Sequence, residues 1–233
     1  MSARSGQAGR AATTTSLFSK SPYGLSGNIP EHSPRQVHMG SASRRVHLWT
    51  GPKSPNARHL VLIRPGSATI RLMRCTLREV RDEDLAVLFE QWADPVAAHM
   101  AAFTRPDHMD RDAFERRWTR LRADETVINR VIVVDGEVAG TIGSWGDPGE
   151  REVTYWIGRS HWGKGVATCA LNAFLTVDPS RPLHARVAHD NVASRRVLEK
   201  CGFRVVATER GFADARSGEI EEFVLRLEKS GSA

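Results

Sequence analysis

The stretch from Val153 to Leu175 constrains this 233-residue chain more than any other. An apolar strand pattern ends there, Gly163 and Gly165 follow, and an apolar helix pattern begins. Glycine lets a ligand come close to the backbone, and the first amide groups of a helix have no partner within the helix. These donors, the positive end of the helix dipole and the Lys164 ammonium favour an anion such as a phosphate. The structural alternative is a plain strand-to-helix turn whose glycines serve geometry only.

The basic charge of the chain is concentrated near its N-terminus. Residues 1–72 hold ten of the 33 Lys and Arg residues and one of the 27 Asp and Glu residues, Glu31. Residues 73–233 are therefore slightly acidic, and we expect no nucleic-acid partner for this part. Residues 1–58 are rich in Ser, Gly, Arg, Ala, Thr and Pro and poor in apolar residues, which is typical of a disordered segment.

Three explanations of the basic segment remain open. It is an organelle transit segment, a basic arm that touches RNA, or upstream sequence translated from an early start codon. Met73 opens a natural domain start, so we predict an N-terminal extension over 1–72 and one domain over 73–233. The apolar run 59–72 is interpreted as an extra edge strand.

The cysteines indicate a reducing compartment. Cys75, Cys169 and Cys201 are odd in number, and the chain has neither a CxxC motif nor a regular Cys/His ligand spacing, so we expect no metal. No run approaches eighteen apolar residues, and the N-terminus lacks an apolar signal segment. We therefore expect a soluble, cytoplasmic protein without a membrane partner.

Hydrophobic periodicity predicts a regular order of elements from Cys75 onward. The first half is expected to hold a strand, a helix that Asp82 caps, a loop, a second helix and a three-strand meander. Their ranges are Thr76–Val80, Asp82–Trp92, 93–109, Asp110–Ala123, Asn129–Val134, Val138–Trp145 and Glu152–Gly158. Between the first two meander strands, Asp135-Gly136 predicts a tight hairpin turn.

The second half is expected to begin with a helix that is apolar nearly all round and therefore buried. A strand over Leu183–His189 and a helix from Asn191 to the closing Gly202 follow. Two last strands, Phe203–Thr208 and Ile220–Leu227, are expected to flank a polar loop.

This order of elements resembles that of the GNAT N-acetyltransferase superfamily, and two motifs carry the resemblance. WGKGVA, residues 162–167, is similar to the acetyl-CoA signature Gln/Arg-x-x-Gly-x-Gly/Ala, except that Trp162 replaces the first polar residue. WGKGVAT and NVASRRVLEKCGF, residues 191–203, resemble the branch of ribosomal-protein N-terminal (alanine/serine) acetyltransferases. The resemblance covers about residues 73–228. It implies an α+β (mixed α/β) fold, with a twisted, mostly antiparallel sheet of six or seven strands and about four helices.

The resemblance also implies a binding site for acetyl-CoA as co-substrate. The amides of residues 163–168 would hold its pyrophosphate, the strand before them would pair with its pantetheine arm, and Asn191 and Ser194 would face the thioester. The expected cofactor-binding residues are Trp156, Ile157, Gly158, Trp162, Gly163, Lys164, Gly165, Val166, Ala167, Thr168, Asn191 and Ser194. Without the resemblance, Asn191 is equally a helix N-cap and Ser194 a small packing residue.

The implied reaction is direct attack of a primary amine on the acetyl carbonyl in a ternary complex. An ammonium cannot attack, so the site must remove a proton and must stabilise the oxyanion and the departing thiolate. We expect Glu152 to be the base, with Glu150 and Asp214 as alternatives. Many relatives reprotonate coenzyme A with a tyrosine, but the matching residue here is Leu198, which leaves Ser194 or water as the proton source.

The sequence departs from the signatures of two other phosphate-binding classes. A phosphate-loop hydrolase needs a hydroxyl where Gly165 stands, and a dinucleotide fingerprint needs a glycine where Thr168 stands. A non-catalytic acyl-CoA sensor and an RNA-associated protein remain alternatives. The acceptor, a small-molecule or a peptide amine, would enter near the loops 93–109 and 210–219, whose mixed composition selects neither a polycation nor a peptide. The oligomeric state, monomer or homodimer, stays open.

Overall fold

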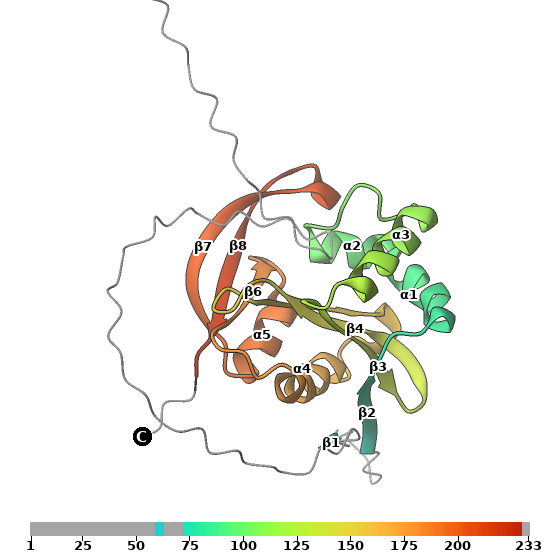
Figure 1. Cartoon of the computed structure of the whole chain (residues 1–233). Coiled ribbons are helices and arrows are strands. Elements are labelled where there is room, and N and C mark those ends of the chain that lie inside the picture. The colour runs from blue at the N-terminus through green and yellow to red at the C-terminus, as the bar shows by residue number, and fades with distance from the viewer. Residues whose placement is uncertain (1–58, 63–71, 230–233) are drawn as a thin grey trace, which may run out of the picture.

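The computed structural model describes residues 59–62 and 72–229, which form one twisted eight-stranded sheet with helices on both faces (Figure 1). The strand order is β1-β2-β3-β4-β5-β6-β8-β7, and every neighbouring pair is antiparallel except β5 with β6. The predicted mixed, mostly antiparallel fold is confirmed. The strands are β1 His59–Leu62, β2 Leu72–Arg78, β3 Ile128–Val134, β4 Glu137–Trp145, β5 Glu152–Ile157, β6 Leu183–Ala188, β7 Arg204–Ala213 and β8 Gly218–Leu227.

Five α-helices and three short 3₁₀ segments lie between these strands in the described residues. The helices are α1 Leu85–Trp92, α2 Pro95–Ala101, α3 Arg111–Ala123, α4 Val166–Val177 and α5 Val192–Lys200, and the 3₁₀ segments are η1 Asp82–Asp84, η2 Arg159–His161 and η3 Asp214–Arg216. The predicted hairpin turn is confirmed, because Asp135 and Gly136 take φ angles of 51° and 97°.

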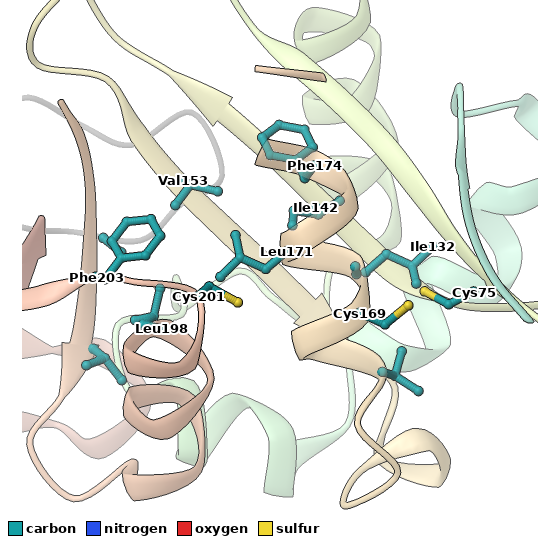
Figure 2. Packing of buried hydrophobic residues seen from close by; sticks show 14 of the residues in the cluster. Cys75, Ile132, Ile142, Val153, Cys169, Leu171, Phe174, Leu198, Cys201 and Phe203 are labelled. Carbon is teal, nitrogen blue, oxygen red and sulfur yellow. The ribbon is translucent and has the colours of Figure 1, made fainter. Parts of the chain in front are cut away.

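The main core lies between the sheet and the helices α4 and α5 (Figure 2). The helix α4 buries residues on most of its circumference, as its sequence predicts, and Phe174 and Leu171 are fully buried against Ile132 and Ile142 of the sheet. Burying each such side chain contributes about 1.5–3 kcal/mol. This packing fixes α4 along the sheet, with its start close after the end of β5 and its end at Ser144 of β4, whose hydroxyl donates to the Asp178 carboxylate.

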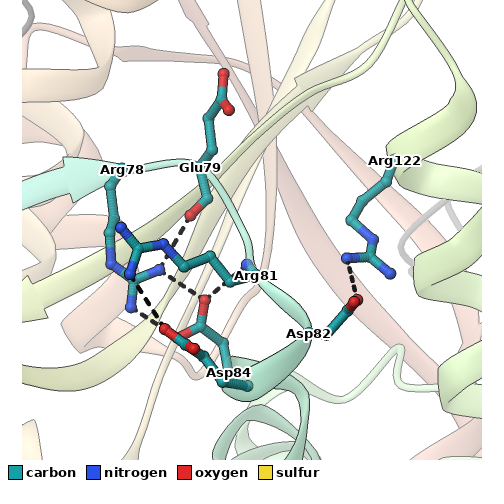
Figure 3. Close-up of polar contacts among 7 residues, drawn as sticks. Arg78, Glu79, Arg81, Asp82, Asp84 and Arg122 are labelled. Atoms are coloured by element: carbon teal, nitrogen blue, oxygen red, sulfur yellow. Dashed lines mark hydrogen bonds and ion pairs between the residues drawn. The ribbon is translucent and has the colours of Figure 1, made fainter.

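The helices α1 and α3 cover the opposite face of the sheet. Leu88 and Trp92 of α1 pack with Phe114 and Trp118 of α3 in a second apolar cluster. Asp84 connects the first helix to β2, because its carboxylate accepts two hydrogen bonds from Arg78, at 2.6 and 2.7 Å (Figure 3). This bidentate pair lowers the pKa of Asp84.

Two predictions about this face were wrong. Residues 93–109 are not a continuous loop, because they contain α2, whose N-terminus is capped by the Asp94 carboxylate and begins with Pro95. Proline is well tolerated at the first helical position, so Pro95 starts a helix here. Asp82 does not cap a helix extending to Trp92: it lies in η1, and its carboxylate accepts a hydrogen bond from Arg122 of α3 at 2.6 Å (Figure 3).

The ends of the domain also differ from the prediction. The strands β7 and β8 extend over most of the expected polar loop, because the chain pairs from Arg204 with Arg226 to Ala213 with Gly218. The apolar run after residue 58 does supply an edge strand, since β1 pairs antiparallel with β2. With these additions the described residues form eight strands and five α-helices, where six or seven strands and about four helices were predicted. The predictions for residues 1–58 lie outside the described residues.

Candidate functional site

The strands β5 and β6 pair at their start and then separate. In the described part of the chain, Glu152 with His184 is the single registered pair between them, although both strands run on to Ile157 and Ala188. The edge of β5 that faces β6 therefore offers backbone donors and acceptors beyond Glu152. Such an edge fits an extended, amide-containing chain that adds to the sheet.

The glycine turn lies at the far end of this opening. Gly163 and Gly165 have φ angles of 71° and 79°, in the left-handed region that favours glycine, and a Cβ on either would meet nothing within 4 Å. Gly165 is the N-cap of α4 and provides no side chain to its first amides. The amides at the start of α4 thus have no side-chain cap, which leaves them available to an anion.

The other predicted cofactor residues surround this turn. Trp162 is 38% exposed and its indole Nε1 donates to the Ile157 carbonyl at 2.8 Å, which holds the turn against the end of β5. Val166 is buried in the main core. Gly158 is packed against Gln91, since a Cβ there would meet the Gln91 side chain at 2.8 Å.

Only the backbone of Trp156 is available to a ligand in the opening. Its indole lies on the α1 side of the sheet, where it packs at a tilt against the Trp92 ring, with centroids 4.4 Å apart, and donates to the Gln91 carbonyl at 2.9 Å. The exposed turn residues Gly163, Lys164 and Gly165 precede the half-buried Ala167 and Thr168 on the first turn of α4.

Asn191 and Ser194 are brought together at the start of α5. The Asn191 side chain caps this helix by accepting from the Ser194 amide at 3.1 Å, and its amide nitrogen donates to the Met100 carbonyl at 3.2 Å. Asn191 thereby joins α5 to the end of α2. The Ser194 hydroxyl is 2.7 Å from the hydroxyl of Tyr155, which the sequence analysis had not singled out.

Tyr155 supplies a phenol at this place, although the position where many relatives have a tyrosine is Leu198 here. Leu198 is buried, as an apolar residue at that position should be. The phenol comes instead from β5, on the face covered by α4 and α5, and burial raises the pKa of Tyr155. A tyrosine in an alternating strand carries no sequence signal for this role, because its partner lies on a helix 39 residues away.

Glu152 lies on the opposite face of β5, at the point where β5 and β6 begin to separate. Its neighbour Val153 belongs to the α4 core, and side chains alternate along a strand. The Glu152 carboxylate is 3.7 Å from the guanidinium of Arg186, which also binds Glu209 and Glu222 at 2.7 and 3.0 Å. The pKa of Glu152 is raised to about 7. Burial is the main cause, Arg186 opposes the rise, and the nearby carboxylates of Glu222 and Glu209 contribute to it.

The two alternative bases lie elsewhere. Glu150 is exposed in the turn before β5, and Asp214 lies in η3 beside the end of α2. In the part of the chain that the structure describes, no three His, Cys, Asp or Glu side chains are grouped as a metal would require. No described helix has the length and apolar character needed to cross a membrane.

Comparison with known families agrees with this geometry. The model of the Acetyltransferase (GNAT) domain matches residues 74–204, more than half of the chain. The chain belongs to the GNAT acetyltransferase family. It is an acetyl-CoA-dependent acyltransferase, and the uncapped start of α4 and the free edge of β5 fit acetyl-CoA as its co-substrate.

The individual relatives compared with this chain are each 26% identical to it or less. The uncharacterized N-acetyltransferase p20 of Bacillus licheniformis is 26% identical over 172 residues, which cover 69% of this chain and 96% of the relative. Among solved structures, Mycobacterium smegmatis RimJ in complex with CoA-disulfide is 24% identical, with a TM-score of 0.56 over 68% of this chain and 82% of that chain. Vibrio cholerae spermidine N-acetyltransferase in complex with CoA and spermine is 18% identical, with a TM-score of 0.60 over 66% and 95%.

Proposed function

We propose that this GNAT acetyltransferase transfers the acetyl group of acetyl-CoA to a primary amine by direct attack in a ternary complex. The observation that carries the proposal is the arrangement around β5. One face of this strand presents Glu152, the other presents the hydrogen-bonded Tyr155–Ser194 pair, and the edge between them is free. A base and a proton donor are thus held on opposite sides of one opening.

Glu152 is the proposed general base. A base works best when its pKa is near the operating pH, and burial raises the pKa of Glu152 to about 7. The Arg186 guanidinium, 3.7 Å away, holds the carboxylate at the start of the opening. In this position Glu152 takes a proton from the incoming ammonium, directly or through one water, and so produces the neutral amine that attacks.

Ser194 is the proposed proton donor to the departing thiolate. Its hydroxyl alone is a poor acid, but it is 2.7 Å from the Tyr155 phenol, which burial keeps protonated. The two hydroxyls form a pair that can donate one proton and share the remaining one. The amides of residues 163–168, in the glycine turn and at the uncapped start of α4, hold the pyrophosphate, and the β5 backbone pairs with the pantetheine amides.

The acceptor is a small-molecule or peptide amine. It reaches the opening from the face that carries α1, α2 and α3, because the other face is filled by the core under α4 and α5. The segment 93–109 and the turn between β7 and β8 meet on that face: the Ala215 amide donates to the Ala102 carbonyl, and Arg216 donates to the His99 carbonyl.

Thiol release from acetyl-CoA tests the proposal. The full chain, incubated with acetyl-CoA and a panel of primary amines and peptides, should release coenzyme A only when an amine is present and should yield a product heavier by one acetyl group. Acetyl-CoA that binds, as measured by calorimetry, but releases no thiol with any member of the panel would favour a non-catalytic sensor.

A further inference from the structure

Four charged side chains form a cluster on the face of the sheet that carries α1, α2 and α3. We call it the Arg186 cluster. Arg186 of β6 binds Glu209 of β7 at 2.7 Å and Glu222 of β8 at 3.0 Å, and Glu152 of β5 is 3.7 Å away. The register explains this meeting, because Glu209 and Glu222 are directly paired across β7 and β8. Four neighbouring strands thus direct one charged side chain each to the same place.

The Arg186 cluster contains more negative charge than its own arginine can compensate. Like charges directly opposite each other on neighbouring strands destabilise a sheet, and one guanidinium would be balanced by one carboxylate. The Glu222 side chain is only 1% exposed, and its Oε1 accepts from Arg186. Its second oxygen, Oε2, is buried and has no hydrogen-bond partner within the described residues.

An unpaired carboxylate oxygen in such a place is costly to the fold. Burial raises the pKa of Glu222 as well as that of Glu152, which shows that the protein environment disfavours the surplus charge. A purely structural ion pair would not need the second and third glutamates. The surplus is explained if a positive group of a ligand completes the cluster.

The Arg186 cluster is open at its rim. Glu152, Glu209 and Arg186 keep 18%, 21% and 13% of their side-chain surfaces exposed. The ring of Phe103, which follows α2, lies beside the cluster: a Cβ on Gly211 would meet this ring at 3.2 Å and Glu222 Oε1 at 3.7 Å. An aromatic ring next to carboxylates is a favourable lining for an ammonium group with an alkyl chain.

We propose that the acetyl acceptor is a diamine-type cation, in which a second ammonium lies a short alkyl chain away from the amine that is acetylated. The attacking amine lies at Glu152, and the second ammonium lies between Glu209 and Glu222. This inference rests on the proposed function of the same site and adds its substrate class. The composition of the loops 93–109 and 210–219 alone does not favour a polycationic acceptor, whereas the Arg186 cluster favours a dication.

Three acceptors of matched length test the inference on the full chain with acetyl-CoA: 1,4-diaminobutane, butylamine and 4-aminobutanoate. They share one primary amine and differ in the charge at the other end. We expect kcat/KM for 1,4-diaminobutane to exceed that for butylamine by about 10- to 100-fold, as one charge-assisted contact allows, and 4-aminobutanoate to be the poorest acceptor. Equal kcat/KM values for butylamine and 1,4-diaminobutane would overturn the inference and leave the proposed function intact.

Two variants locate the second contact. Glu209→Gln should lower the ratio of 1,4-diaminobutane to butylamine at least about fivefold. Glu221→Gln is the matched control, since it removes the same charge from an exposed residue next to Glu222 and should leave the ratio unchanged. A ratio that falls equally in both variants would assign the preference to net charge and overturn the site.

If no acetyl transfer is detected, a binding measurement tests the diamine site separately from the proposed acetyl transfer. Calorimetry with coenzyme A at saturation measures the affinity for 1,4-diaminobutane and butylamine without acetyl transfer. Preferential binding of 1,4-diaminobutane without any acetylation would support the cation site and contradict the proposed function. Absence of both binding and acetylation of 1,4-diaminobutane would overturn the inference, while the amine and peptide panel would still decide the proposed function.

Discussion

The glycine turn and the Arg186 cluster are the two halves of the candidate site, and they are built in opposite ways. The turn consists of consecutive residues, is exposed, and offers backbone amides with no side-chain cap at Gly165. The cluster consists of buried or half-buried side chains from four strands. In the proposed function, the first half recognises its ligand through backbone amides, and in the further inference the second half does so through charged side chains.

This difference predicts different responses to mutation. At Gly163 and Gly165 a side chain acts by straining or blocking the backbone, whereas a change of Lys164 removes one exposed charge beside the predicted anion site. A change of one carboxylate in the cluster alters charge directly at the acceptor. The two halves should therefore separate cleanly into effects on acetyl-CoA binding and effects on turnover.

The largest expected effect is that of Glu152→Gln. The amide cannot take a proton from the acceptor, so kcat should fall by about 100-fold or more while the Kd for acetyl-CoA stays unchanged. Steady-state kinetics and calorimetry measure the two quantities. Glu150→Gln, two residues earlier in an exposed turn, is the matched comparison. A loss of turnover in Glu150→Gln instead of Glu152→Gln would transfer the role of base to Glu150.

The pH dependence of kcat/KM should reflect the titration of Glu152. Because burial raises the pKa of Glu152 to about 7, the base is protonated and inactive below that pH. We expect kcat/KM to fall about tenfold per pH unit below 7 in addition to the titration of the acceptor amine. The fall near pH 7 should be missing from the residual activity of Glu152→Gln. If this variant keeps the same profile, another group controls the acidic limb.

In the other half, Gly165→Ala should weaken acetyl-CoA binding. Alanine strains the left-handed backbone at φ 79° and moves the first amides of α4, for which we expect a rise in Kd of about tenfold. Gly136→Ala is the control, since it has a similar φ of 97° in a hairpin turn with nothing within 4 Å of a Cβ. Equal Kd values for the two variants would show that the turn is only a structural connection.

The smallest expected effect concerns the proton donor. Tyr155→Phe and Ser194→Ala should each lower kcat about fivefold, with KM nearly unchanged, because the departing thiolate can still take a proton from water. If the two hydroxyls act as a pair, the double variant should be no worse than the poorer single variant. Fully additive losses would show that Tyr155 and Ser194 act independently.

Features that depend on neighbouring residues were predicted from the sequence. The meander, the buried α4 and the strand-turn-helix at Gly165 were predicted correctly, since each depends on neighbouring residues and on a clear periodicity. The helix α2 was not predicted because it is only seven residues long and has no long apolar stripe. Its one sequence signal is Asp94 followed by Pro95 at the start. Glu152 was singled out, and its role remains a prediction.

The sequence by itself determined the proposed cofactor half of the site, because an anion site of this kind needs only two glycines and the start of a helix close together in the chain. Only the tertiary structure decided the proposed acceptor half. Arg186, Glu209 and Glu222 are unremarkable charged residues in three separate strands, and Tyr155 is one residue of an alternating strand. Sheet register and the separation of β5 from β6 bring these groups together, and register depends on the packing of the whole domain.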